Sequence, residues 1–356
     1  MKKLYFIKSI SLILISVFSN AYGLPGEGVV LDPNTGDYLI TYFGAGAPGD
    51  KKNRILRQVI FVPATKIEPS LLSLFKRSGD SDIVYAYRVT NGKKSRQSLD
   101  MMLFDPISDI LSSTQLPKQD REININNIEQ IIAAGTSALN TPENWTGRTT
   151  TSRAGGLRIG WSYTGDGGLL PGKKQGGFGF SSKDIPGIVL AQLQGYAPGS
   201  GGYPDDGPSF DSEASKQLAL IEQHDYVTRP AAIPSIAVPA PFNAAVLLNS
   251  IQTQMHTWIA MHLIDVTFSS QLDRYLTAAA NAYRLNQPKV GKEHIETLRK
   301  MLKKEHEDIG RDEEHESDKS PEREDDKRVR MIDRLAARVL DFDLQYVLKR
   351  MDKDRD

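Results

Sequence analysis

The pattern of apolar residues changes near the middle of this 356-residue chain. Before Gly195 it consists of short runs rich in β-branched and aromatic residues, separated by glycine and proline, which is typical of strands joined by turns. After Phe242 the apolar residues recur at steps of three and four, which is typical of amphipathic helices. The sequence therefore predicts a β-rich first half followed by a helical region.

Several runs of the first half have the composition of strands. In residues 82–90 the odd positions are large and β-favouring, so we expect one face of that strand to be buried: Ile83, Tyr85, Tyr87 and Val89. A turn cluster at residues 32–37 separates two β-rich runs and predicts a hairpin. The predicted strands are 29–31, 38–43, 55–62, 82–90, 97–104, 157–164, 177–181 and 187–193. Together they predict an antiparallel β-sandwich, with short helices at residues 69–77 and 127–139 as exceptions.

The transition between the two halves is rich in glycine and proline. Residues 195–210 contain both, and residues 229–242 contain four prolines, which predicts an extended connector. Between them, Ser212 is expected to cap a short helix. The predicted domains are a β-sandwich over residues 24–200, a connector over 201–243 and a helical region over 244–356.

The helical region contains four apolar stripes. They begin near Ala244, Leu272, Ile295 and Ile332, and Ser269 or Ser270 is the expected cap of the second helix. Residues 305–328 are dense in mixed charge and nearly free of apolar side chains, so they cannot bury enough surface to offset their ordering entropy. We expect a mobile loop there, joining the last two helices as an antiparallel hairpin.

The N-terminal 23 residues have the pattern of a secretory signal peptide. Lysines at positions 2, 3 and 8 precede a short apolar run, residues 10–18, which is shorter than the roughly 20 residues needed to span a bilayer. Small residues at Ala21 and Gly23 predict cleavage after Gly23, with Ser19 and Ala21 offering a second frame. The mature chain is therefore expected in the periplasm or outside the cell.

Composition narrows the partners of the mature chain. Without the three lysines of the signal, 41 of the 44 basic residues remain beside 44 acidic ones, a net charge of about −3, which does not indicate nucleic-acid binding. No cysteine is present, so neither a disulfide nor a lipid anchor is expected. No later segment has the length and apolarity of a membrane span.

Two short motifs suggest chemistry in the first half. Residues 44–49, Gly-Ala-Gly-Ala-Pro-Gly, match the glycine pattern of dinucleotide-binding loops, but they follow a hairpin rather than start a βαβ unit, which favours a plain loop. Ser73 and Lys76 match the S-x-x-K pattern of penicillin-interacting enzymes, without the companion motifs of that class. The alternative for these residues is a short packed turn among leucines.

Other candidates concern metals and ligands. Asp205, Asp206 and Asp211 lie in the glycine-rich segment and carry the oxygen ligands that calcium prefers, without EF-hand spacing. No other cofactor is expected. The six histidines are scattered, and His256 and His262 face different sides of a helix.

The aromatic residues offer a second type of ligand site. Trp145, Tyr196 and Tyr203 are candidates for a sugar-binding platform, because flat rings pack on the apolar faces of sugars. Trp161 is instead expected in the core of the sandwich.

Two phrases carry a resemblance. Residues 85–91 (YAYRVTN) and 171–187 (PGKKQGGFGFSSKDIPG) are similar to phrases in uncharacterised exported bacterial proteins with immunoglobulin-like strands. The resemblance implies an immunoglobulin-like sandwich and no particular activity. Together these observations predict an exported, non-catalytic protein that binds an envelope glycan or protein. The alternative is a hydrolase acting on envelope polymers.

Overall fold

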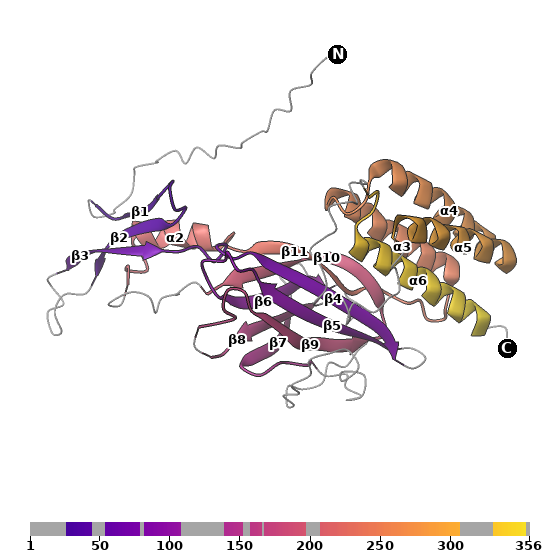
Figure 1. The fold of residues 1–356 in the computed structure, drawn as a ribbon, viewed down its shortest axis with the longest axis horizontal. Helices are drawn as coiled ribbons and strands as arrows, with labels where there is room; N and C mark the ends of the chain where they lie inside the picture. The colour runs from indigo at the N-terminus through magenta and orange to yellow at the C-terminus, as the bar shows by residue number, and fades with distance from the viewer. Residues whose placement is uncertain are drawn as a thin grey trace, which may run out of the picture. The chain divides into compact units, whose positions relative to one another are not determined.

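The computed structural model describes residues 26–44, 54–78, 82–107, 139–151, 157–165, 167–196, 207–306 and 330–353. The predicted signal peptide with its cleavage site after Gly23 lies outside these residues, and so does nearly all of the charged stretch 305–328. Within them, strands in antiparallel sheets precede most of the helices, so the fold is α+β (Figure 1).

The contacts divide the chain into two compact units. Unit 1 comprises residues 1–62 and 198–224, and unit 2 comprises residues 63–197 and 225–356. The boundaries expected from the sequence, at residues 200 and 243, stay a prediction about where separate domains begin.

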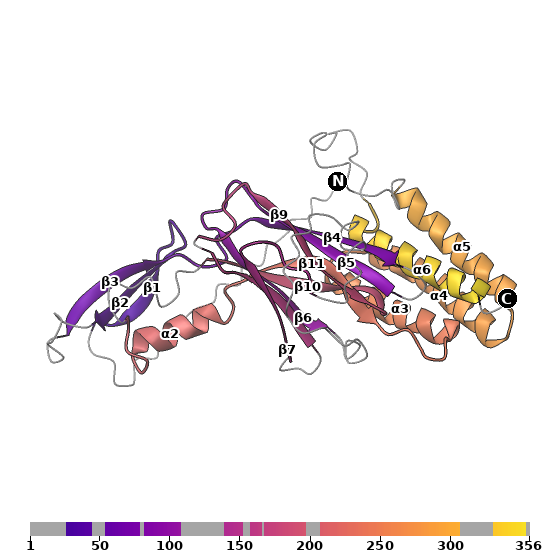
Figure 2. The same ribbon diagram turned by 90° about the horizontal axis from the view of Figure 1, so that it is seen from below.

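Unit 1 is a three-stranded antiparallel sheet with one helix. The strands β1 (Gly28–Leu31), β2 (Tyr38–Gly44) and β3 (Ile55–Phe61) pair in that order, which confirms the predicted hairpin of the first two. Helix α2 (Glu213–Glu222) lies along this sheet (Figure 2), and the Ser212 hydroxyl caps it by accepting a hydrogen bond from the Ser215 backbone N at 3.1 Å.

Unit 2 contains two further antiparallel sheets. One has the order β4-β5-β9, with bounds Pro69–Ser78, Asp82–Asn91 and Lys174–Ser182. The other has the order β11-β10-β6-β8-β7. Its strands are Val227–Ile236, Ile185–Gly195, Leu99–Ile107, Leu157–Tyr163 and Trp145–Thr151.

Aromatic side chains from both sheets form the core of unit 2. The ring of Tyr87 in β5 lies 4.7 Å from that of Phe104 in β6, and Trp161 in β8 lies 5.6 Å from Phe178 in β9. Trp161 is fully buried and its indole N–H donates to the Asn140 carbonyl at 3.0 Å, which confirms its predicted place in the core. The predicted buried face of β5 is confirmed, and on its other face Val84 and Ala86 are buried as well.

Strand β4 corrects one sequence-based prediction. Residues 69–77, expected as a short helix, pair with β5 from Pro69 opposite Asn91 to Ser78 opposite Asp82. Their leucine spacing fits a helical turn locally, but the long partner strand β5 pairs with the backbone groups on one side of β4 along its whole length, and tertiary pairing overrides weak propensity. The other short helix expected at residues 127–139 lies almost entirely outside the described residues.

Strand β11 shows what the proline-rich segment does. Residues 229–242 are extended through Ile236, as expected, but as a strand paired with β10 rather than as a connector. Pro230 and Pro234 are tolerated because β11 is at the edge of its sheet, where a missing N–H need not break a ladder bond. Strand β7 was not expected from the sequence.

The four remaining helices are α3 (Ala244–Ala260), α4 (Val266–Arg284), α5 (Pro288–Glu305) and α6 (Arg334–Lys353), gathered as one group in Figure 1. The predicted cap of α4 is wrong: Ser269 and Ser270 lie inside the helix, and Asp265 caps it by accepting from the backbone N of Thr267 and Phe268. A carboxylate one turn earlier satisfies the free N–H groups that the serines cannot reach.

Helix α6 packs on strand β4. The ring of Phe342 meets that of Phe75 edge-on at 5.2 Å, and the Arg77 guanidinium lies 5.1 Å from the centre of the Tyr346 ring. Helices α5 and α6 are joined by ion pairs from Arg299 to Asp341 and from Lys292 to Asp352. Among the described residues, no helix has the length and apolarity needed to cross a membrane.

Candidate functional site

One face of the unit 1 sheet carries exposed aliphatic side chains. Val30 is directly opposite Leu39, and Leu39 is directly opposite Ile60, so the three project from the same face. Val30 and Ile60 are each 65% exposed and Leu39 is 37% exposed. Phe43 and Leu56 form another opposite pair on this side, which we call the bare face: Val30, Leu39, Phe43, Leu56 and Ile60.

The central part of the opposite face of the same sheet is buried, whereas Leu31 and Ile55, at two strand ends of that face, are 51% and 47% exposed. Ile40 is 1% exposed, and Tyr42 and Phe61 are also buried. Helix α2 lies against β1 and β2, and its own buried residues are Ala214 and Leu218. One amphipathic helix can cover only one face of a small sheet. Because α2 is the single described helix of unit 1 and lies on the opposite face, the bare face is exposed to solvent.

Polar side chains protect the β1 edge of this sheet. The Gln217 side chain of α2 accepts a hydrogen bond from the Val29 backbone N at 2.9 Å. Next to it, the Glu27 carboxylate accepts from the Phe43 backbone N at 3.0 Å. The Gln217 contact supplies an acceptor that an edge strand otherwise seeks from another chain, and the Glu27 contact satisfies a backbone N–H of β2 just beyond the pair of Gly28 and Thr41.

The bare face has the chemistry of an interaction surface. Its five side chains carry no charge, and the polar residues between them, Thr41 and Gln58, are hydrogen-bonded to each other at 3.4 Å. Contiguous exposed apolar side chains on a folded protein mark contacts with another surface, whereas single exposed ones need no explanation.

Ser73 and Lys76 are not brought together by the structure. They are three residues apart in strand β4, which places them on opposite faces of the strand. Ser73 is buried, and its hydroxyl oxygen accepts a hydrogen bond from the Ala232 backbone N at 3.1 Å. The hydroxyl thus contacts a neighbouring strand instead of facing a lysine.

The aromatic candidates are also separated. Trp145 is buried, with its ring 5.0 Å from that of Phe178 and 5.4 Å from that of Tyr163. Tyr196 is 47% exposed at the end of β10, and Tyr203 lies outside the described residues. A platform that includes Trp145 would require its ring to leave the core.

The candidate calcium ligands are only partly described. Asp211 is exposed just before α2, whereas Asp205 and Asp206 lie outside the described residues, as do residues 45–49 of the glycine motif. In the part of the chain that the structure describes, no group of three or more His, Asp or Glu side chains could hold a metal ion.

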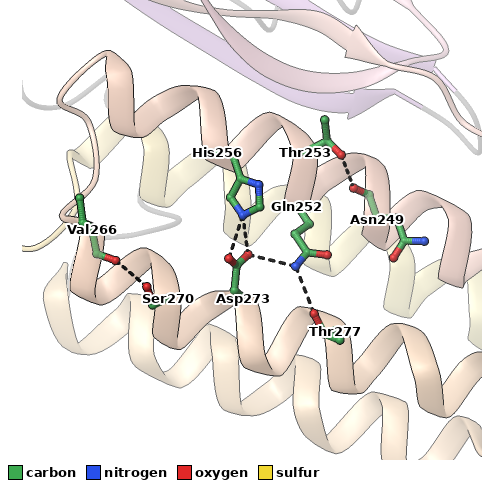
Figure 3. Close-up of polar contacts among 8 residues, drawn as sticks. All are labelled: Asn249, Gln252, Thr253, His256, Val266, Ser270, Asp273 and Thr277. Atoms are coloured by element: carbon green, nitrogen blue, oxygen red, sulfur yellow. Dashed lines mark hydrogen bonds and ion pairs between the residues drawn. The ribbon is translucent and has the colours of Figure 1, made fainter.

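A polar network joins helices α3 and α4 at their surface (Figure 3). The His256 ring nitrogen Nε2 lies 2.9 and 2.8 Å from the two carboxylate oxygens of Asp273, and the Gln252 amide donates to Asp273 and to the Thr277 hydroxyl, each at 3.1 Å. Each helix supplies two residues four apart, which places them on one face. The network therefore consists of polar side chains that join the two helices at their surface.

Two of the buried carboxyl groups described in unit 2 have a raised pKa. Asp343 in α6 is fully buried, neither of its oxygens has a hydrogen-bond partner, and burial raises its pKa well above the ordinary 3.8. Burial also raises the pKa of Asp184, to about 6, against the lowering effect of its hydrogen bonds with the Val238 backbone and the Ser182 side chain. Burial raises the pKa of Tyr85 too, and the nearby charges of Tyr87, Asp343 and Asp184 add to this.

The sequence reasoning missed the bare face. All three strands were predicted from the sequence, but the covered side of each strand was not. One signal was present: the run Ile55–Phe61 carries apolar residues on both faces, as only a strand covered on both sides or engaged in binding should. Comparison with models of protein families, with curated proteins and with solved structures gives no match to this chain. The candidate site is therefore supported by its geometry alone.

Proposed function

We propose that this chain is an exported, non-catalytic protein that binds another protein of the bacterial envelope or exterior through the bare face of unit 1. The observation that carries the proposal is the uncovered aliphatic surface formed by Val30, Leu39 and Ile60. Export rests on the N-terminal pattern of lysines, apolar run and small residues, and implies the periplasm or secretion.

The chemistry of the surface favours a protein over a glycan as the ligand. Sugars bind where aromatic rings and hydrogen-bonding side chains converge, whereas the bare face is mainly aliphatic. A sheet face of this kind pairs with another apolar sheet or helix face, as layers do inside a domain.

The proposal includes a finer description of unit 2. The two sheets that share the aromatic core around Trp161 form an immunoglobulin-like sandwich, and α5 and α6 form an antiparallel hairpin. The ion pairs support the hairpin, because Lys292 near the start of α5 contacts Asp352 near the end of α6 and Arg299 contacts Asp341. This scaffold would carry unit 1 without contributing chemistry of its own.

Site-specific photo-crosslinking in a cell that exports the chain tests the proposal. A photoreactive residue at Leu39 should give a discrete adduct with one protein, and Ile60→Glu should abolish that adduct because it places a charge in the apolar contact. A photoreactive residue at Leu285 serves as the matched control, since Leu285 is 69% exposed and lies in unit 2. Equal adducts at both positions, or an adduct that survives Ile60→Glu, would contradict the proposal.

The hydrolase alternative makes a separate prediction. If Ser73 were a nucleophile, Ser73→Ala would abolish turnover of peptidoglycan or esters by the purified chain. The hydrogen bond from Ala232 to the Ser73 hydroxyl favours a structural role, so we expect no turnover that depends on Ser73.

A further inference from the structure

The two edges of the unit 1 sheet differ in how their backbone groups are satisfied. Strand β1 has four residues, and Gln217 accepts a hydrogen bond from its outward N–H at Val29. Strand β3 has seven residues, and among the described residues no strand pairs with its outer side. An edge strand that is long, apolar and uncovered is a template for pairing with another strand.

The hydrogen bonds of the sheet show which groups of β3 point outward. The Phe43 backbone N donates to Glu27, so the odd residues of β2 direct their backbone groups toward β1 and the even ones toward β3. Tyr38, Ile40, Tyr42 and Gly44 are opposite Phe61, Val59, Arg57 and Ile55. The even residues of β3 therefore direct their N–H and C=O groups away from the sheet: Leu56, Gln58 and Ile60.

These three residues are symmetric about Gln58. If a second copy of β3 runs antiparallel with Gln58 opposite Gln58, then Leu56 is opposite Ile60 on both sides of the axis, and all outward groups of the three residues find partners. In the same register Ile55 is opposite Phe61, and Arg57 is opposite Val59. A shift of the second strand by two residues in one direction places Arg57 opposite Arg57, where like charges oppose pairing.

We propose that two copies of this chain associate through their β3 strands, antiparallel and centred on Gln58, to form one continuous six-stranded sheet. In this arrangement directly opposite residues share a face, so the two bare faces join into one larger apolar surface. The association uses backbone groups at the sheet edge, whereas the proposed function uses the side chains of the bare face, so each can fail without the other.

Charge reversal at the symmetry axis tests the pairing. The full chain should form a dimer whose population rises with concentration in analytical ultracentrifugation. Gln58→Glu and Gln58→Lys should each weaken the dimer about fivefold, because each places like charges opposite one another. An equimolar mixture of the two variants should recover association as a heterodimer, because residue 58 of one copy then faces the opposite charge.

Thr41→Glu and Thr41→Lys are the matched controls. Thr41 projects from the same face beside Gln58 but lies on the central strand, away from the axis. Its variants should dimerise as the parent chain does. A full chain that is monomeric at all concentrations, variants at residue 58 that dimerise unchanged, or a mixture that does not recover would each overturn the proposal.

A cysteine variant keeps the test decisive if a charged variant fails to fold. The chain has no cysteine, so Gln58→Cys introduces one thiol per copy. Residues opposite each other in an antiparallel pair lie within the Cα separation that a disulfide allows. Mild oxidation should yield a covalent dimer for Gln58→Cys and much less for Thr41→Cys, whereas equal yields would contradict the β3 pairing.

Discussion

The sheets of unit 1 and unit 2 have strands of similar composition, but they differ in how completely their apolar side chains are buried. In unit 1, Ile60 and Val30 are large apolar residues left on the outside. In unit 2, a second sheet and helix α6 cover the apolar faces so completely that carboxyl groups such as Asp343 are enclosed with them. A small sheet with one helix has too few layers to bury both of its faces. A unit with more layers buries both faces of its sheets and some carboxyl groups as well.

The largest expected loss of stability comes from a substitution in the buried core of unit 2. Trp161→Ala should lower the free energy of unfolding by about 3–5 kcal/mol, because it opens a cavity among the core rings and leaves the Asn140 carbonyl without its indole donor. Denaturant unfolding followed by far-UV circular dichroism measures it. Trp161→Phe is the control and should lose less; a loss below about 1 kcal/mol for Trp161→Ala would show that the core is not tightly packed.

Two adjacent residues of β2 compare the two faces of unit 1. Ile40→Ala should lower local stability by about 2–5 kcal/mol, because Ile40 is buried, whereas Leu39→Ala should change it by about 0.5 kcal/mol or less. Hydrogen exchange of the β2 amides reports on this unit alone. Equal losses would mean that the bare face is covered within the chain itself.

The buried carboxyls allow a comparison within one helix. Asp341 accepts a hydrogen bond from Arg299 at 2.6 Å, whereas Asp343 has no hydrogen-bond partner. At pH 8, Asp341→Asn should lower the free energy of unfolding by about 1–3 kcal/mol, and Asp343→Asn should raise it by about the same amount because no carboxyl must then be kept neutral. Thermal unfolding at pH 8 measures both, and a loss in Asp343→Asn would mean that the carboxylate is stabilised in place.

The pH dependence of stability tests Asp184. Because its pKa is raised in the folded state, its contribution to stability is fully present below about pH 3.8 and is lost as the pH rises through about 6. The parent chain should therefore lose stability over this window relative to Asp184→Asn. Unfolding free energies of both chains at several pH values between 3 and 7 give the difference, which should be flat if Asp184 titrates normally.

The smallest effect is expected on the surface of the helical region. His256→Ala should lower the free energy of unfolding by about 0.2–1 kcal/mol, because hydrogen bonds and ion pairs between exposed side chains contribute little, and salt screens any ionic part of the contact. A double-mutant cycle with Asp273→Ala at low and high salt isolates the pair. A coupling well above this range would indicate that the network of Figure 3 stabilises the helices more than a surface contact does.

The sequence predicted where strands and helices lie better than it predicted which strands pair and which faces are buried. The strands rich in β-branched and aromatic residues were found because composition alone marks them, and the cap at Ser212 was found because it depends on its own helix. Strand β4 was missed because its leucines fit a helical turn until β5 is placed beside it. Whether Leu39 or Ile40 faces solvent depends on a helix far along the chain, and no local pattern encodes that choice.

The hydrogen bond between Val29 and Gln217 spans 188 positions of the chain. A chain that leaves the ribosome or crosses a membrane from its N-terminus would present β1, β2 and β3 long before α2 exists, so both faces of the sheet stay apolar and bare during most of synthesis or export. Only the arrival of residues 213–222 completes unit 1. Unit 1 can therefore complete its folding only after most of the β-strands of unit 2 have been synthesised or exported. A chain that ends before residue 213 would lack the helix that completes unit 1.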